Sequence, residues 1–217
     1  MATIKNKQID RVCVIDDDEA SRYAMGLTVE DSKLIAVPQN QKIDNLDAYF
    51  NEIVKPSDAI VSDHHLRKKN YFPVNGAEVV SRSYDKRIPS VLVTKYEQAV
   101  IDEIRKYRQK IPIILNPDEF DPDSLMQSLE FCINEFNGEI VPSRKVWRTL
   151  IRVDDIGDNH LYLIIPSWNS NETIKIPIKD LPVDIQSKAK ADVRMHAKVN
   201  VGATLSNDLF FLDWEIN

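Results

Sequence analysis

The sequence is poor in the residues on which several common protein classes depend. Two cysteines in 217 residues provide neither a disulfide framework nor four metal ligands, and we expect both, Cys13 and Cys132, to be buried. Five scattered glycines form no phosphate-binding loop. No apolar run approaches the roughly eighteen residues of a membrane span, and the polar start MATIKNKQIDR is unlike a signal peptide. We therefore expect a cytoplasmic protein with no membrane partner.

The chain has the composition of a globular protein, with 43% apolar and 29% charged residues. Its net charge of −6 is unevenly distributed. From Val141 onward there are ten basic and ten acidic residues, so all the net acidity lies before that point. The sequence pattern changes at the same place, from alternating apolar and helical stretches to short strands separated by turn residues. These two changes predict two domains, 1–140 and 141–217.

In the first domain the strand candidates are continuously apolar, as expected for strands that helices cover on both faces. They are 11–15, 34–37, 59–62, 90–93 and 112–115. The helical stretches are 19–29, 46–54, 76–84, 98–108 and 124–136, the last with Asp123 as a predicted cap. This alternation predicts an α/β fold with a doubly wound five-stranded parallel sheet.

The second domain has five strand candidates in about 70 residues, and closing them on one another removes exposed sheet edges. They are 147–153, 160–165, 173–176, 192–199 and 209–215, with turns at 156–159 and 169–171. We therefore predict a small all-β barrel.

Acidic residues follow two of the predicted parallel strands. Asp16, Asp17 and Asp18 come directly after the first strand, and Asp63 follows the third. Ligand sites on parallel sheets form at the carboxyl ends of the strands, so these carboxylates should meet at one edge and repel each other. A Mg²⁺ ion, which prefers oxygen ligands, would relieve the repulsion and could assist a carboxylate nucleophile in phosphoryl transfer.

Four segments together resemble the receiver domain of response regulators in two-component and phosphorelay systems. They are VCVIDDD at 12–18, AIVSDHHL at 59–66, SVLVTKY at 90–96 and IPIILNP at 111–117. The resemblance covers residues 10–137 and implies a flavodoxin-like fold. It also implies a response regulator that a histidine kinase or phosphotransfer protein phosphorylates and that signals to a protein effector.

The resemblance also assigns roles to individual residues. Asp63 would be the phosphoacceptor, and Asp16 with Asp17 the acidic pair, Asp17 being the more direct Mg²⁺ ligand. The backbone carbonyl of His65 would be a further metal ligand. The hydroxyl of Thr94 would bind a phosphoryl oxygen.

The chain departs from the receiver pattern near the same site. Asn116 replaces the lysine that pairs with the acceptor, Ile113 takes the place of an aromatic residue, and Lys95 that of a small residue. Residues 64–75 form a longer, more basic loop that includes Arg67, Lys68 and Lys69. In one hypothesis Lys95 or a lysine of the 67–69 segment supplies the missing cation and Asp63 is phosphorylated. In the other, the domain is a degenerate receiver and serves as a binding module. Retention of Asp16, Asp17 and Asp63 favours the first.

Two simpler interpretations of the acidic residues remain open. Residues 16–18 could form a solvated loop in which Asp18 caps the next helix. Asp63 with His64 and His65 could bind a transition metal, although adjacent histidines on an extended chain point in opposite directions.

The ligand of the second domain is less constrained. A basic run, Arg144, Lys145, Arg148 and Arg152, lies in a domain that is neutral overall, so we expect a protein partner rather than nucleic acid. We predict that Trp147 and Trp214 pack together to close the barrel, and that Trp168 lies in a turn where it could contact a ligand. The sequence leaves a homodimer open. It offers no basis for catalysis beyond self-phosphorylation, so we do not expect an enzyme.

Overall fold

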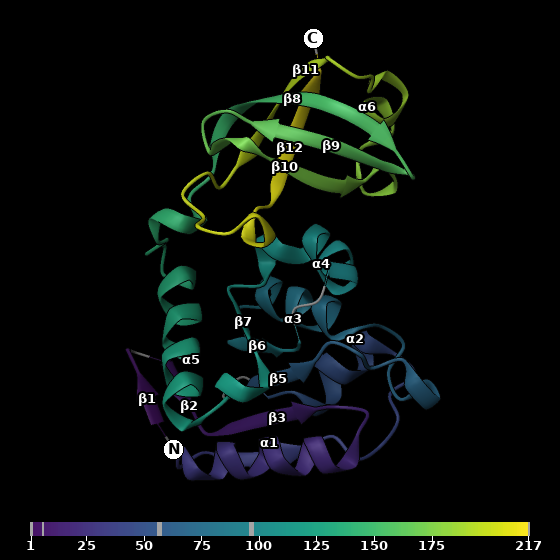
Figure 1. The fold of residues 1–217 in the computed structure, drawn as a ribbon. Coiled ribbons are helices and arrows are strands. Elements are labelled where there is room, and N and C mark those ends of the chain that lie inside the picture. Colours follow the sequence, from purple (N-terminus) through teal and green to yellow (C-terminus); the bar gives the residue numbers. More distant parts are fainter. Residues whose placement is uncertain (1, 6, 56–57, 96–97, 217) are drawn as a thin grey trace. The chain divides into compact units, whose positions relative to one another are not determined.

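The computed structural model describes residues 2–5, 7–55, 58–95 and 98–216. The chain forms two compact units (Figure 1). The first contains Met1–Tyr96 and Lys110–Glu139, and the second contains Glu97–Gln109 and Ile140–Asn217. The second unit therefore includes a segment that the chain supplies before the first unit is complete. Among the described residues, no helix has both the length and the apolar character needed to cross a membrane.

The first unit contains the predicted five-stranded parallel sheet. Its strands are β3 Arg11–Ile15, β4 Ile35–Pro38, β5 Asp58–Asp63, β6 Ser90–Val93 and β7 Ile113–Leu115. They lie in the order β4-β3-β5-β6-β7, and every neighbouring pair is parallel. Numbered within this sheet, the order is 2-1-3-4-5, which is the flavodoxin-like arrangement. The predicted fold class of this unit is confirmed.

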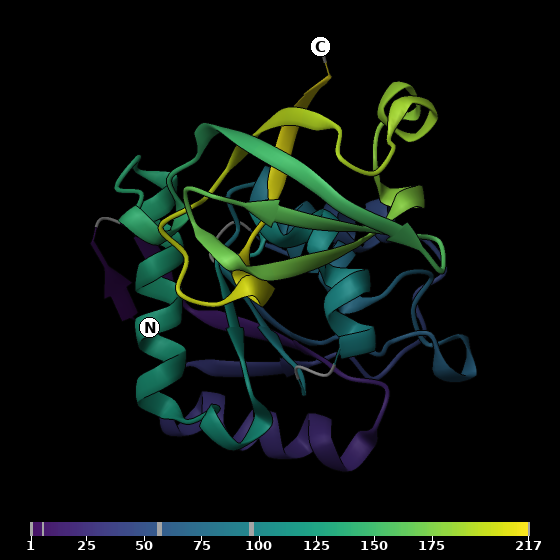
Figure 2. The same ribbon diagram turned by 45° about the horizontal axis from the view of Figure 1, so that its top comes forward.

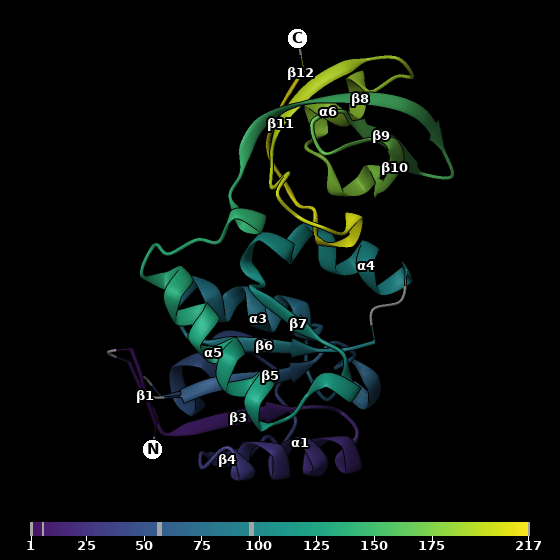
Figure 3. The same cartoon turned by 60° about the vertical axis from the view of Figure 1, so that its left-hand side comes forward.

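Two helical layers cover this sheet because alternate strand side chains point to opposite faces. Val12 and Val14 contribute to one core with α1 (Glu19–Asp31) and α5 (Pro122–Phe136). Cys13 and Ile15 contribute to the other core. That core also contains side chains from α2 (Leu46–Ala48), the π-helical turn Tyr49–Ile53 and α3 (Gly76–Asp85). Figure 3 shows α5 beside β6 and β7.

The structure differs from the sequence prediction in a few elements of this unit. The cap of α5 is Asp121, not Asp123, because Pro122 occupies the first helical position and the Asp121 carboxylate accepts a 2.7 Å bond from the Ser124 N–H. A hairpin of β1 (Ala2–Ile4) and β2 (Lys7–Ile9) was not predicted. Its short strands gave no clear sequence period.

The second unit contains a five-stranded antiparallel sheet, which curves in Figure 2. Its strands are β8 Trp147–Gly157, β9 His160–Ile165, β10 Asn169–Pro177, β11 Arg194–Val199 and β12 Phe211–Ile216. The order is β10-β9-β8-β11-β12, and the unpredicted helix α6 (Val183–Lys188) lies between β10 and β11 in the chain. Within the described part of the chain no strand pairing joins the two edge strands β10 and β12, so the five predicted strands form an open antiparallel sheet.

Residues 98–108, predicted as one helix, form α4 (Gln98–Ile104) followed by the 3₁₀ helix Arg105–Lys110. Arg105 and Lys106 line one small cavity with Ile176 of β10 and Trp214 of β12. The Arg105 Nη1 donates bonds of 3.0 Å to the carbonyls of Ser206 and Leu209. This segment therefore lies beside both edge strands of the sheet.

One prediction about tryptophans in this unit is wrong. Trp147 is 61% exposed and does not close the barrel. Trp214 instead stacks on Phe211, with ring centroids 5.2 Å apart. Trp168 lies in the predicted turn, is partly buried against the core and donates its indole N–H to the Ala203 carbonyl at 2.7 Å. Its contact with a ligand stays a prediction.

Candidate functional site

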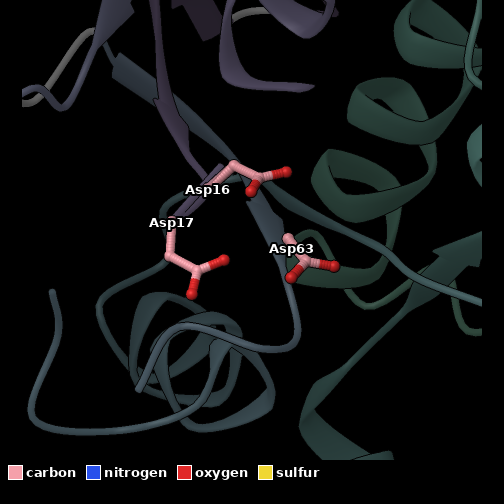
Figure 4. Close-up of side chains that lie close together, drawn as sticks. All are labelled: Asp16, Asp17 and Asp63. Carbon is pink, nitrogen blue, oxygen red and sulfur yellow. The ribbon is translucent and has the colours of Figure 1, made fainter. Parts of the chain in front are cut away.

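Three carboxylates meet at the carboxyl edge of the parallel sheet. Asp16 and Asp17 follow β3, and Asp63 ends β5, the neighbouring strand, with Ile15 opposite Ser62. One ligand oxygen from each of the three residues lies within 4.8 Å of the others (Figure 4). The predicted convergence of these residues is confirmed. We call the three residues the acidic pocket.

Asp16 is held by the start of α1. Its Oδ1 accepts a 2.8 Å bond from the Asp18 N–H, while the Asp18 carboxylate caps the helix through a 2.9 Å bond from the Ser21 N–H. The Arg22 guanidinium donates a 2.6 Å bond to the Asp16 carbonyl. Asp18 is thus the capping residue that the solvated-loop interpretation requires. That interpretation does not describe Asp16, which is only 5% exposed.

Burial raises the pKa of Asp16 from 3.8 to about 6. The bond from the Asp18 N–H acts in the opposite direction, and the negative charges of Asp63, Asp17 and Asp18 raise the pKa further. The ionised form is therefore costly unless a cation is bound. An all-oxygen donor set under mutual repulsion fits Mg²⁺, and Asp16, Asp17 and Asp63 are the residues that could hold it.

The backbone beyond Asp63 is closely packed. The Asp63 Oδ2 accepts a 2.7 Å bond from the His65 N–H, and Gly76, the first residue of α3, donates its N–H to the His64 carbonyl at 2.8 Å. A Cβ atom at Gly76 would lie 1.8 Å from the Asp63 carbonyl oxygen. Only glycine allows α3 to begin this close to the strand end.

The basic loop 64–75 is anchored rather than freely extended. Leu66 and Phe72 are buried, and a 3.0 Å bond joins the Phe72 N–H to the Leu66 carbonyl. Arg67 and Lys68 are exposed on the outside of this loop. The Tyr71 hydroxyl donates a hydrogen bond to the Gln39 carbonyl. The guanidinium of Arg22 lies over the Tyr71 ring, with its central carbon 5.6 Å from the ring centroid.

Arg22 was missed by the sequence reasoning. It is 8% exposed, and it connects the Asp16 backbone to the Tyr71 ring of the loop. The signal was an arginine four residues after the capping Asp18, on the face of the helix that also carries Met25 and Val29.

The remaining predicted site residues follow the next two strands. Thr94 is 2% exposed and lies one residue beyond the Asp63–Val93 pair of β5 and β6. Lys95 is exposed. Asn116 is exposed too, and its N–H donates a 3.1 Å bond to the carboxylate of Glu119. His64 is buried, and neither His64 nor His65 contributes a side chain to the acidic pocket. The roles of Thr94, Lys95 and the His65 carbonyl stay predictions.

Comparisons with known proteins find similarity at the level of solved structures. No family model matches the chain, and no curated protein does. A response regulator receiver domain protein from Clostridium thermocellum is similar over 61% of this chain and 100% of that one, with 13% identity and a TM-score of 0.46. A CheY-like receiver domain protein from Methanospirillum hungatei JF-1 covers the same shares, with 15% identity and a TM-score of 0.44. Full-length FixJ from B. japonicum is similar over 59% of this chain and 60% of that chain, with 20% identity and a TM-score of 0.43.

Proposed function

We propose that this protein is a cytoplasmic response regulator of a phosphorelay. In this proposal Asp63 accepts a phosphoryl group from a histidine kinase or phosphotransfer protein, and the second unit carries the signal to a protein effector. The observation that supports it most directly is the acidic pocket, in which carboxylates from two neighbouring strand ends lie within 4.8 Å.

The chemistry requires one nucleophilic oxygen and compensation of negative charge. The His65 N–H engages Oδ2 of Asp63, which leaves Oδ1 to attack phosphorus as the bond to the donor's imidazole nitrogen breaks. Mg²⁺ held by Asp16, Asp17, Asp63 and the His65 carbonyl would neutralise charge in the transition state. The Thr94 hydroxyl would donate to a phosphoryl oxygen.

Because Asn116 stands where receivers carry a lysine, a charge-assisted hydrogen bond worth about 1.5–3 kcal/mol is lost. In our proposal Lys95, or a lysine of the 67–69 segment, replaces it. The phosphoryl charge near Thr94 would then shift the equilibrium of a two-state loop, as in other phosphorylation switches.

Incubation with acetyl phosphate and Mg²⁺ tests the acceptor. We expect intact mass and Phos-tag gels to show one added phosphoryl group on the wild type and on Asp31→Asn, a control that removes an exposed carboxylate at the end of α1. The Asp63→Asn variant should stay unmodified. An unmodified wild-type chain would refute phosphorylation of this pocket.

A second candidate function is a degenerate, unphosphorylated adaptor. The residue at position 116 favours it, because asparagine carries no charge where receivers carry a lysine, and its backbone N–H only takes part in the cap of the turn Pro117–Glu119. In that case partner binding and cellular output would be the same in Asp63→Asn and the wild type.

For the second unit we propose a protein partner. Small five-stranded barrels often bind oligonucleotides, but this requires compensation of phosphate charge. The segment 97–109 adds three basic and three acidic residues to a domain that is already neutral. Nucleic-acid binding would instead appear as a salt-dependent affinity that is lost when Arg144, Lys145 and Arg148 are replaced together.

A further inference from the structure

A histidine at the start of β9 is held in one orientation by the turn before it. Asp158 and Asn159 have positive φ angles of 50° and 62°, as a two-residue hairpin turn requires. The Asp158 carbonyl lies 2.6 Å from Nδ1 of His160. Because a carbonyl only accepts hydrogen bonds, Nδ1 carries the proton, and the lone pair of the neutral ring is on Nε2.

This Nε2 atom faces a carboxylate from α4. Its distance to Oδ2 of Asp102 is 3.5 Å, longer than the 2.7–3.2 Å typical of an N–H···O bond. In the neutral ring both atoms are acceptors, so they cannot bond to each other directly. The other carboxylate oxygen of Asp102 is buried and has no hydrogen-bond partner within the described part of the chain. With the neutral ring, two electron-pair donors thus face each other, and either a proton on Nε2 or a bound cation would satisfy them.

The spacing matches that of two ligands on one metal ion. Zinc binds imidazole nitrogen at about 2.0–2.1 Å and carboxylate oxygen at about 2.0–2.2 Å, so two ligands at the tetrahedral angle lie about 3.4 Å apart. A backbone carbonyl on the opposite ring nitrogen is also the usual support for a metal-binding histidine, since it fixes both tautomer and orientation.

The surroundings leave room for further ligands. Asp102 and His160 line a pocket of about 680 Å³ that can hold water molecules as the remaining ligands. Glu103, Asp158 and Lys179 also line it, so the charges around it favour a cation. Burial raises the pKa of the nearby Asp180. The positive charges of Lys106 and Lys179 lower this pKa, and the negative charge of Asp102 raises it further.

We propose that Asp102 and His160 form a binding site for a divalent transition-metal ion of the Zn²⁺ type. Its nitrogen and oxygen donors distinguish it from the acidic pocket, whose oxygen donors suit Mg²⁺. The ion would join α4 to β9 and so fasten the segment 97–109 to the rest of the second unit. The site is independent of phosphorylation.

Calorimetric titration of the full chain with Zn²⁺, in excess Mg²⁺ to occupy the acidic pocket, tests the site. We expect one Zn²⁺ per chain, and an affinity at least about 10-fold weaker in His160→Gln and in Asp102→Asn. His196→Gln, which removes a histidine from β11, is the matched control and should bind as the wild type does. Zn²⁺ should also raise the unfolding temperature of the wild type and the control, but not of the two site variants.

Three results would overturn the proposal: no Zn²⁺ binding by the wild type, unchanged binding by His160→Gln, or loss of binding in His196→Gln. Should a site variant fail to fold, Co²⁺ absorption of the wild type decides the question. An intense visible band, as tetrahedral coordination gives, supports the site, and a weak octahedral band refutes it.

Discussion

Replacing Asp16 with asparagine should stabilise the folded protein at neutral pH. The pKa of Asp16 rises from 3.8 to about 6 on folding, chiefly through burial. Because a tenfold change in a protonation constant corresponds to about 1.36 kcal/mol, the ionised carboxylate lowers the free energy of unfolding by about 3 kcal/mol. Asparagine has the same shape, carries no charge and can still accept the bond from the Asp18 N–H.

The pH dependence of this effect has a definite sign. Below about pH 3 the carboxyl is protonated in the folded and unfolded chains and costs nothing. Between about pH 3 and 6 the folded chain binds the extra proton, so stability falls as the pH rises, and above about pH 6 nearly the full penalty applies. The advantage of Asp16→Asn should therefore be about 0.5 kcal/mol at about pH 4 and about 3 kcal/mol at about pH 7.5.

Urea unfolding of both proteins at these two pH values measures the difference, in which the titration of all other groups cancels. Mg²⁺ at ten times its dissociation constant should stabilise the wild type by about 1.4 kcal/mol and the variant by much less. Asp31→Asn controls for the loss of a carboxylate. If Asp16→Asn raised the free energy of unfolding equally at both pH values, or not at all at about pH 7.5, folding would not raise the pKa of Asp16.

Three further variants test other parts of the structure. Gly76→Ala should lower the free energy of unfolding by about 2 kcal/mol or more in urea melts, because its Cβ would lie 1.8 Å from a carbonyl oxygen. Gly26→Ala in α1 should raise it by about 0.5–1 kcal/mol, because its Cβ would make an ordinary contact of 3.8 Å with Ala36, and equal effects of the two changes would contradict this. Arg105→Ala should cost about 3 kcal/mol in thermal melts, since one buried and one partly buried hydrogen bond to carbonyls are lost, whereas replacing the exposed Lys106 with alanine should cost little. Asn116→Lys should speed phosphorylation by acetyl phosphate if the missing cation limits the rate, and an unchanged rate would show that another residue already supplies it.

Local sequence patterns were sufficient to predict the parallel sheet and its acidic pocket. Continuously apolar runs end in polar residues, and the geometry of parallel strands places Asp16, Asp17 and Asp63 at one edge. What could not be predicted depends on contacts between residues far apart in the chain. Arg22 is an ordinary helical arginine until loop 64–75 folds over it, and Trp147 has a strand pattern although no partner covers it.

The helix α6 was missed for a different reason. It has six residues and a single buried apolar side chain, Ile185, so it lacks a helical period long enough to detect. The bonds of Arg105 to Ser206 and Leu209 span about a hundred residues and have no local signal. They explain why the segment 97–109 groups with the second unit in the structure but looked like part of an uninterrupted α/β pattern.

The placement of this segment has a consequence for how the protein is made. During synthesis α4 leaves the ribosome long before β12, the strand with which Arg105 and Lys106 share a cavity. The first unit can complete its sheet at β7, but the second has to wait for nearly the whole chain before α4 finds its partners. A fragment that begins at Ile140 would leave the Ser206 and Leu209 carbonyls without their donor. The antiparallel sheet is therefore not a portable module that can be cut from the end of the chain and transferred to another protein.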